Sequence, residues 1–234
     1  DRSMVSAMLQ ADDYIDVMIP RGGKGLVEKV MGESLMPVFA HLEGLCHTYV
    51  HKSADPEKHR DMCLNSKMRR TGIGGATETI LLDKALPEKT AKSVIAALLD
   101  SGCDVVATHE IKGLDRRVGT AKEADWETEY LDAKVSVRTV RNVEDAVRFI
   151  NALGSHHTDS VIAEDETAAE YFLRHVDSGI VMHNASTQFA DGGEFGMGAE
   201  IGISTGKLHA RGPVGLKQLT TYKYLVRGKG HVRP

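Results

Sequence analysis

Short apolar runs alternate with amphipathic stretches along most of this chain, and glycines or polar turns separate them. The apolar runs are about five residues long, as buried strands are, and the stretches between them carry apolar side chains at helical spacing. Strands that alternate with helices in this way predict an α/β fold with a largely parallel sheet. The runs expected to form strands are 15–19, 36–40, 46–50, 78–82, 104–107, 133–137, 159–163 and 180–183.

Several of the intervening helices carry recognisable start and stop signals. Pro87 stands at a favoured position in the first turn of one helix, and Gly102 marks its end. Asn142 is placed to cap a second helix, which Gly154 closes. Further helices are expected at 26–31, at 56–70 and around 168–172. The apolar helical side chains that should share one core are Val94, Ile95, Leu98, Phe149, Ile150 and Phe172.

The composition is typical of a soluble globular protein. Hydrophobic residues make up 41% of the 234 residues, charged residues make up 26%, and the formal net charge is −4. These values give no electrostatic reason to expect binding to nucleic acid or to an anionic membrane. No apolar run approaches the roughly 20 residues of a membrane span. Three cysteines, Cys46, Cys63 and Cys103, follow no disulfide pattern, which favours a reducing cytoplasmic location.

The most distinctive segment is rich in glycine and lies near the end of the chain. It reads NASTQFADGGEFGMGAE at 184–200 and KLHARGP at 207–213. Glycine this frequent disfavours a buried helix or a central strand, where each glycine costs about 0.5–1 kcal/mol relative to alanine. The phenylalanine, methionine and isoleucine side chains between the glycines argue against disorder. We therefore expect a shaped loop whose backbone comes close to a ligand or to another backbone.

This segment resembles the C-terminal signature of gamma-glutamyl phosphate reductase (glutamate-5-semialdehyde dehydrogenase), of the aldehyde dehydrogenase superfamily. The resemblance implies an aldehyde dehydrogenase-like α/β fold and the NADPH-dependent reduction of a small-molecule substrate. That substrate is L-glutamyl 5-phosphate, which yields L-glutamate 5-semialdehyde and phosphate in the second step of proline biosynthesis. It also implies a homo-oligomer and a functional association with glutamate 5-kinase.

The resemblance also implies a division of the chain, which is similar to the C-terminal part of a longer protein. Residues 1–44 would be the end of a Rossmann-like dinucleotide-binding domain, and 45–190 the catalytic domain. Residues 191–234 would form a returning segment and an oligomerisation tail. Within that tail, 220–226 has strand composition, and in the superfamily such a strand extends the sheet of a partner.

Two features are candidates for holding NADPH. Arg21, Gly22, Gly23 and Lys24 follow an expected strand and open a helix, an arrangement that suits phosphate binding, although glycine turns are common without any ligand. The family carries a matching I-P-R-G-G loop beside the cofactor. Glu129 lies in a segment that resembles the family's W-x-x-E-Y-L, whose glutamate binds the ribose next to the nicotinamide. An isolated glutamate is otherwise usually a surface charge.

Residues 65–79 resemble the family's nucleophile segment except at one position, where Gly74 replaces the catalytic cysteine. In the family, that cysteine forms a thiohemiacetal and a thioester with the substrate carbonyl. Glycine has no side chain, so this chain should be nearly inert in the reaction. A second departure is Gln188, where many relatives have arginine. The alternative to an enzyme is a non-catalytic interaction module that keeps the fold.

Three other groups of residues have simpler interpretations. Cys46 precedes His47, but neighbours on a strand point to opposite faces, so we expect Cys46 to pack or to line a pocket rather than act as the nucleophile. His59 and Cys63 share a helix face without a recognised zinc spacing, and we expect no metal; His59 could instead face water.

Histidines and an aspartate at 154–159 could suggest acid–base chemistry, but a turn in which Ser155 and Asp159 cap backbone groups is favoured. For the substrate, the candidates are Asn184, His209 and Arg211 in the glycine-rich segment. Arginine pairs well with phosphate oxygens, so His209 and Arg211 are the expected contacts of the acyl phosphate.

Overall fold

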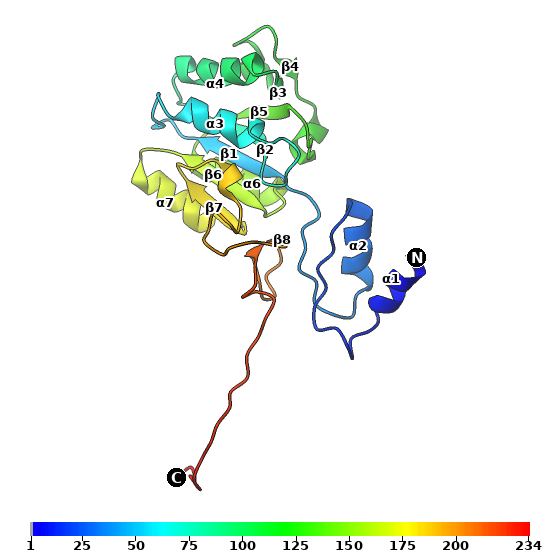
Figure 1. Cartoon of the computed structure of the whole chain (residues 1–234). Coiled ribbons are helices and arrows are strands. Elements are labelled where there is room, and N and C mark those ends of the chain that lie inside the picture. Colours follow the sequence, from blue (N-terminus) through cyan, green and yellow to red (C-terminus); the bar gives the residue numbers. More distant parts are fainter. Residues whose placement is uncertain (1) are drawn as a thin grey trace.

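The centre of the molecule is a seven-stranded sheet whose paired strands all run parallel. The structure is a computed structural model that describes residues 2–234. The strand order is β4-β3-β5-β2-β1-β6-β7 (Figure 1). The strands are β1 (Cys46–Val50), β2 (Thr77–Asp83), β3 (Asp104–Ala107), β4 (Gly119–Thr120), β5 (Lys134–Val140), β6 (Thr158–Ile162) and β7 (Ile180–His183). The predicted α/β class with a parallel sheet is confirmed.

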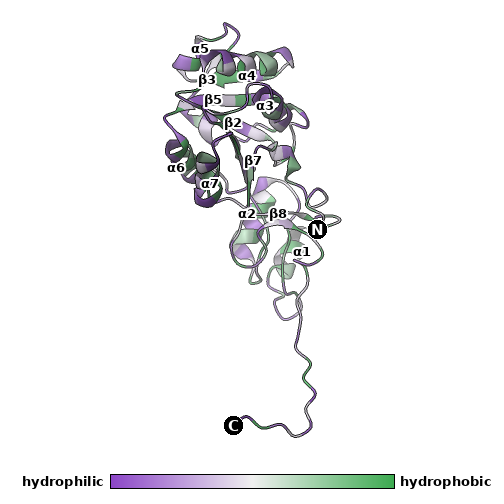
Figure 2. Cartoon of the chain, turned by 90° about the vertical axis from the view of Figure 1, so that its left-hand side faces the viewer, coloured by the Kyte–Doolittle hydropathy of each residue, from purple (hydrophilic) through white to green (hydrophobic). Residues whose placement is uncertain are grey.

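Helices cover both faces of this sheet (Figures 1 and 2). Helices α3 and α4 pack against each other on one face, and α6 and α7 do so on the other. The longer helices are α3 (His59–Met68), α4 (Glu88–Asp100), α6 (Val143–Leu153) and α7 (Glu166–His175). The shorter ones, which the sequence analysis missed, are α5 (His109–Lys112) and the 3₁₀ turns η1 (Glu123–Glu127) and η2 (Thr187–Phe189). Asn142 caps α6 as predicted, because its side chain accepts a hydrogen bond from the Asp145 amide.

The prediction of a single core is wrong. Val94, Ile95 and Leu98 of α4 belong to one buried cluster, whereas Ile150 and Phe172 belong to another. The sheet separates the two clusters because successive strand residues point to opposite faces. Both clusters are continuous layers, so the sheet is buried on its two sides, as expected for parallel strands joined by helices.

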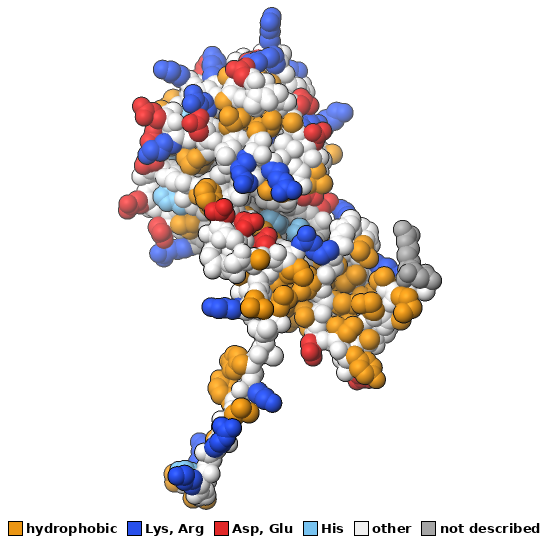
Figure 3. Space-filling model, viewed as in Figure 1, with side chains coloured by type: hydrophobic (Ala, Val, Ile, Leu, Met, Phe, Trp, Pro, Cys, Tyr) orange, Lys and Arg blue, Asp and Glu red, His pale blue; other side chains and the backbone are white. Residues whose placement is uncertain are grey.

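The N-terminal lobe, residues 2–45, contains α1 (Arg2–Met8) and α2 (Lys24–Glu33). The predicted strands at 15–19 and 36–40 are wrong as strands, because the two segments meet only at a single parallel bridge between Met18 and Val38. No third strand lies beside them in the described chain to extend the pairing. This lobe exposes several large apolar side chains (Figure 3): Met4, Met8, Tyr14, Leu26, Met31, Leu35 and Leu42.

The glycine-rich segment ends in a short antiparallel pair that the sequence analysis did not predict. Strands β8 (Gly202–Ser204) and β9 (Gly212–Val214) form it. Residues 220–234 then leave the body as an extended tail without helix or strand (Figure 1). The strand expected at 220–226 is therefore not formed in the single chain, because no sheet of residues 2–234 offers it a neighbour.

No helix among residues 2–234 has both the length and the apolarity to span a bilayer. The three cysteines are buried free thiols.

Candidate functional site

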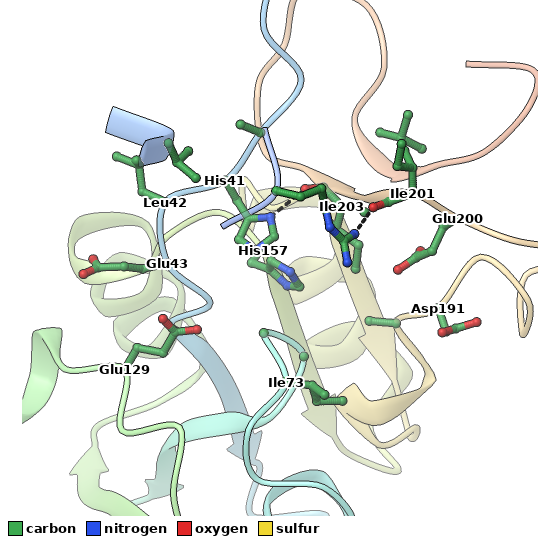
Figure 4. Close-up of a pocket in the computed structure, with 18 of the residues that line it drawn as sticks. His41, Leu42, Glu43, Ile73, Glu129, His157, Asp191, Glu200, Ile201 and Ile203 are labelled. Atoms are coloured by element: carbon green, nitrogen blue, oxygen red, sulfur yellow. Dashed lines mark hydrogen bonds between the residues drawn. The ribbon is translucent and has the colours of Figure 1, made fainter. Parts of the chain in front are cut away.

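A pocket of about 790 Å³ lies where the N-terminal lobe meets the sheet (Figure 4). Its walls come from the segments that precede strands β1, β2 and β6: residues 41–43, 72–75 and His157. Since parallel strands begin at the same edge of a sheet, the segments leading into them converge there. Residues 200–203 of the glycine-rich segment close the opposite side. The glycine-rich segment therefore does come close to other parts of the chain, as expected, and it does so at this pocket wall.

Gly74 lines this pocket and rests directly on the start of β1. A Cβ placed on Gly44 would lie 2.3 Å from the Gly74 carbonyl oxygen, so residue 44 must be glycine for the two backbones to meet. The thiol of Cys46 donates to the same carbonyl oxygen at 2.9 Å. Burial raises the pKa of the Cys46 thiol well above its ordinary value. Cys46 is fully buried and lies behind Gly74, which supports a packing role for it.

Two imidazoles face Gly74, and they are the site residues that the sequence analysis missed. A Cβ at position 74 would lie 3.2 Å from His157 Nε2 and 3.5 Å from His41 Nε2. The two rings meet edge to face with centroids 4.8 Å apart (Figure 4). His41 Nδ1 lies 2.7 Å from the Ile203 carbonyl oxygen, and because that oxygen can only accept, Nδ1 carries the proton.

The missed histidines differ in whether any sequence signal could have found them. His157 comes just before β6, as Gly74 comes just before β2, so the starts of the predicted strands could have placed the two side by side. His41 lies in the N-terminal lobe outside any predicted strand or motif, and no comparable signal marks it.

His157 is uncharged at neutral pH. Burial lowers its pKa from 6.5 to about 3, and the nearby His41 lowers it further. Its Nδ1 lies 2.9 Å from the Thr158 hydroxyl, and its Nε2 faces Gly74. A neutral imidazole beside position 74 can form a hydrogen bond with a group placed there.

We expect acid to destabilise the protein in part through His157. Below pH 6.5 the unfolded chain binds a proton at this histidine, whereas the folded protein does so only near pH 3, so this contribution to stability is complete above 6.5 and falls as the pH drops. Between about pH 7 and pH 5 the wild type should lose on the order of 1–2 kcal/mol more unfolding free energy than His157→Gln. Urea denaturation at both pH values measures this difference. The tail variant His231→Gln should behave like the wild type, and equal losses in all three proteins would contradict the assignment.

All residues proposed to hold the cofactor line the same pocket as Gly74: Arg21, Gly22, Gly23, Lys24 and Glu129. The Arg21 guanidinium donates to the Ile201 carbonyl oxygen, and Lys24 pairs with Glu43. Helix α2 begins at Lys24, so its N-terminus opens on the pocket.

Glu129 is held in place from the sheet side of the pocket. Its Oε1 accepts a hydrogen bond from the Gly44 amide at 2.9 Å. Figure 4 shows the carboxylate of Glu129 beside Glu43, on the side of the pocket away from Glu200.

The structure does not bring the three predicted substrate residues into the pocket. The Asn184 amide bonds to the backbone N–H and carbonyl of Ala163, each at 2.9 Å. The Arg211 guanidinium pairs with the Asp177 carboxylate at 2.8 Å and also donates to the Asp177 carbonyl. His209 is exposed and none of the three lines the pocket. Asn184 and Arg211 thus anchor the glycine-rich segment, and other parts of that segment form the pocket wall.

Gln188, the second departure from the family pattern, does line the pocket. Its Nε2 donates to the carbonyl oxygens of Ser66 and Arg70, which fixes the orientation of the amide. Its Oε1 is buried and has no hydrogen-bond partner among residues 2–234. Both departures, Gly74 and Gln188, therefore lie in the wall of one pocket.

The remaining polar groups hold the fold together. Asp159 Oδ1 accepts hydrogen bonds from the amide and the ring of His47, and Ser155 accepts one from the Leu45 amide, so both cap backbone groups as predicted. His59 is buried rather than facing water, because its ring bonds to a backbone carbonyl and to Ser93. No cluster of three or more potential metal ligands occurs among residues 2–234.

Comparisons with known proteins bear on the fold and on the resemblance noted in the sequence. Over all 234 residues the chain is 57% identical to the gamma-glutamyl phosphate reductase of Rhodospirillum rubrum, and it covers 55% of that protein's length. The crystal structure of gamma-glutamyl phosphate reductase from Thermotoga maritima matches with a TM-score of 0.96 at 39% identity, covering 100% of this chain and 56% of that one. No protein-family model matches the chain.

More distant structures share the fold. An acetylating aldehyde dehydrogenase from Geobacillus thermoglucosidasius matches 94% of this chain and 58% of its own, with a TM-score of 0.69 at 20% identity. The chain therefore spans a little over half the length of the relatives it matches. The resemblance predicted from the sequence is confirmed: over its whole length the chain is similar to the C-terminal part of gamma-glutamyl phosphate reductases, and its fold is that of the aldehyde dehydrogenase superfamily.

Proposed function

We propose that this chain carries the catalytic part of a gamma-glutamyl phosphate reductase. The reaction is the NADPH-dependent reduction of L-glutamyl 5-phosphate to L-glutamate 5-semialdehyde with release of phosphate, in proline biosynthesis. The observation that carries the proposal is one pocket lined by both Gly74 and the residues assigned to the cofactor, although Gly74 lies about 50 residues from Arg21 and from Glu129 in the sequence. The test is phosphate-dependent turnover with and without a cysteine at position 74.

The residues present fit a nicotinamide dinucleotide. The N-terminus of α2 opens on the pocket, where the first amides of the helix and Lys24 can meet a pyrophosphate. Glu129 uses only Oε1 for the Gly44 amide, which leaves Oε2 to accept from a ribose hydroxyl. The cofactor, when bound, supplies the hydride for reduction.

The other pocket residues would orient the reacting carbonyl and the group that attacks it. The seating of Gly74 on Gly44 and Cys46 fixes the backbone at the point of attack. The neutral His157 ring faces position 74 at hydrogen-bonding distance, so it would orient a thiol placed there. Without a side chain at position 74 there is no nucleophile, so the chain with Gly74 is expected to be inactive.

Cofactor binding should depend on the charge of Glu129. We expect Glu129→Gln, in a full-length reductase that carries this segment, to weaken NADPH binding by about tenfold, because a neutral acceptor replaces a charged one. The glutamine can still accept from the Gly44 amide, so the loop should keep its place. Fluorescence titration with NADPH measures the effect. The exposed neighbour Glu127→Gln is the control, and equal affinities for both variants would refute the ribose contact.

The alternative function is a non-catalytic interaction module with the aldehyde dehydrogenase fold. Gly74 favours it, because the change removes the group on which the chemistry depends. The codon for residue 74 in the parent gene discriminates between the two functions. A glycine codon supports the module, whereas a cysteine codon supports an enzyme that was altered at one position.

The division into domains and the assembly are part of the same proposal. The apolar surface of the N-terminal lobe supports its assignment, over residues 1–44, to the end of a larger dinucleotide-binding domain. Residues 45–190 would be the catalytic domain, and 191–234 the returning segment and oligomerisation tail. The exposed tail at 220–226, with Tyr222, Tyr224, Leu225 and Val226 uncovered, supports a homo-oligomer formed through it. The lability of an acyl phosphate would favour an association with glutamate 5-kinase, its supplier.

A further inference from the structure

Arg211, which was expected to contact the acyl phosphate, already has hydrogen-bond partners within the chain. Arg211 donates to the Asp177 carboxylate, to the Asp177 carbonyl and to the Thr205 carbonyl, and it does not line the pocket. Its donors are used for anchoring the glycine-rich segment. Any cation that binds a phosphoryl group in the pocket must therefore be another residue.

Two other arginines are free and line the pocket. Arg69 and Arg70 follow directly on α3 and stand five and four residues before Gly74, respectively. Their guanidinium groups make no hydrogen bond or ion pair with any residue of the described chain, 2–234. The other basic pocket residues with long side chains, Arg21 and Lys24, are held by the Ile201 carbonyl and by Glu43.

Hydrogen bonds hold the backbone of Arg69 and Arg70 in place. The Arg70 carbonyl accepts from the Gln188 amide, and the Arg69 amide donates to the Asn65 carbonyl at the end of α3. The side chains themselves remain exposed and unpaired. Two guanidinium groups on a fixed backbone can grip one oxyanion with paired hydrogen bonds.

We propose that Arg69 and Arg70 form a phosphoryl-binding subsite beside the reacting position. This inference rests on the proposed function. When a thiolate at position 74 forms its bond to the acyl carbon, the bond from that carbon to the phosphate oxygen breaks, and inorganic phosphate leaves with the electron pair. The arginine pair holds the phosphoryl group before this step and balances its charge as it leaves.

A simpler role for arginines in this place is an interaction with the C-terminal end of the α3 dipole. That role affects the stability of the helix, but it gives no specific affinity for phosphate. Equilibrium binding of inorganic phosphate therefore separates the two roles.

The test is a calorimetric titration of the 234-residue chain with inorganic phosphate at constant ionic strength. We expect a dissociation constant on the order of 1 mM, weakened at least about tenfold by Arg69→Met and by Arg70→Met. Arg70→Lys should give an intermediate value, because it keeps the charge but loses the paired donors. Arg116→Met is the matched control, since Arg116 is exposed, lies outside the pocket and makes no ion pair with residues 2–234. Circular dichroism confirms that each variant is folded.

Three results would overturn the subsite: no phosphate binding up to about 50 mM, equal weakening by Arg116→Met, or phosphate affinity unchanged in both methionine variants. Parallel titrations with glutarate and NADPH identify a carboxylate or a cofactor phosphate as the true ligand if the two variants affect those instead. Phosphate binding needs no nucleophile. A chain that binds phosphate through Arg69 and Arg70 while Gly74→Cys stays inactive would keep the subsite and refute the proposed function.

Discussion

The Gly74→Cys substitution, made in a full-length reductase that carries this segment, is expected to raise turnover by about 10⁶, the scale on which covalent enzymes lose activity when the nucleophile is removed. The reaction to assay is the phosphate-dependent oxidation of L-glutamate 5-semialdehyde, followed by NADPH formation. The gain comes from one group, because the rest of the pocket is already assembled around position 74.

The backbone at Gly74 can accept the new side chain. Gly74 is not among the residues of positive φ, so a cysteine there meets no backbone strain. Its Cβ would lie 3.2 Å from His157 Nε2, and a shift of a few tenths of an ångström in that ring relieves the contact. The variant should therefore fold as the parent does.

Cys46 supplies the control for this experiment. Cys46→Ala, added to the Gly74→Cys variant, removes a buried thiol that bonds to the Gly74 carbonyl and lies 3.6 Å from His157 Nδ1, and it should change the restored activity far less. A folded but inactive Gly74→Cys protein, together with residual turnover that Cys46→Ala abolishes, would refute position 74 as the site of attack.

The second large effect is on stability and concerns the buried ion pair between Lys67 and Glu78. Lys67 Nζ lies 2.6 Å from Glu78 Oε2, and the two side chains are 0% and 2% exposed. The pairing of β1 with β2 skips Glu78, so its carboxylate is turned from the strand toward α3. Burial raises the pKa of Glu78 to about 7, against the opposing effect of Lys67. We expect Lys67→Met to lower the unfolding free energy by about 3–5 kcal/mol, because it leaves a buried carboxylate unpaired.

Urea denaturation at neutral pH measures this loss. The double variant Lys67→Met with Glu78→Leu removes both charges and should recover much of the stability. Lys92→Met is the surface control, since Lys92 pairs with Glu88 in the open, and it should change little. A loss for Lys67→Met no larger than that for Lys92→Met would show that the buried pair contributes nothing.

The sequence predicted the sheet well because periodic apolar runs depend on local pattern alone. The runs at 46–50, 104–107 and 180–183 coincide with β1, β3 and β7. The runs at 15–19 and 36–40 have the same composition but lack a sheet to join, so they form a single bridge. Strand composition was also not enough at 220–226. A strand needs a neighbour, and the sequence of the strand does not say whether one is present.

The candidate site was predictable where a motif or a strand start marks it. Gly74 and Glu129 lie in motif segments, and both line the pocket. Asn184 and Arg211 lie in an equally distinctive motif, but their side chains anchor the loop instead of lining the pocket. The motif alone does not reveal which of its side chains have that role. His41 joins the site only through the packing of the N-terminal lobe against the sheet. That contact is long-range and leaves no local signal.

The most direct test of the pocket as the reaction site uses the full-length reductase with the Gly74→Cys substitution. The protein is incubated with L-glutamate 5-semialdehyde and NADP in the absence of phosphate and is then examined by mass spectrometry. Without phosphate to release it, the acyl group should remain on the protein as a thioester, with about one NADPH formed per chain. Peptide mapping should place that acyl group at residue 74, and the addition of inorganic phosphate should remove it. An acyl group on Cys46, or no acylation at all of a folded protein, would contradict position 74 as the site of the covalent step.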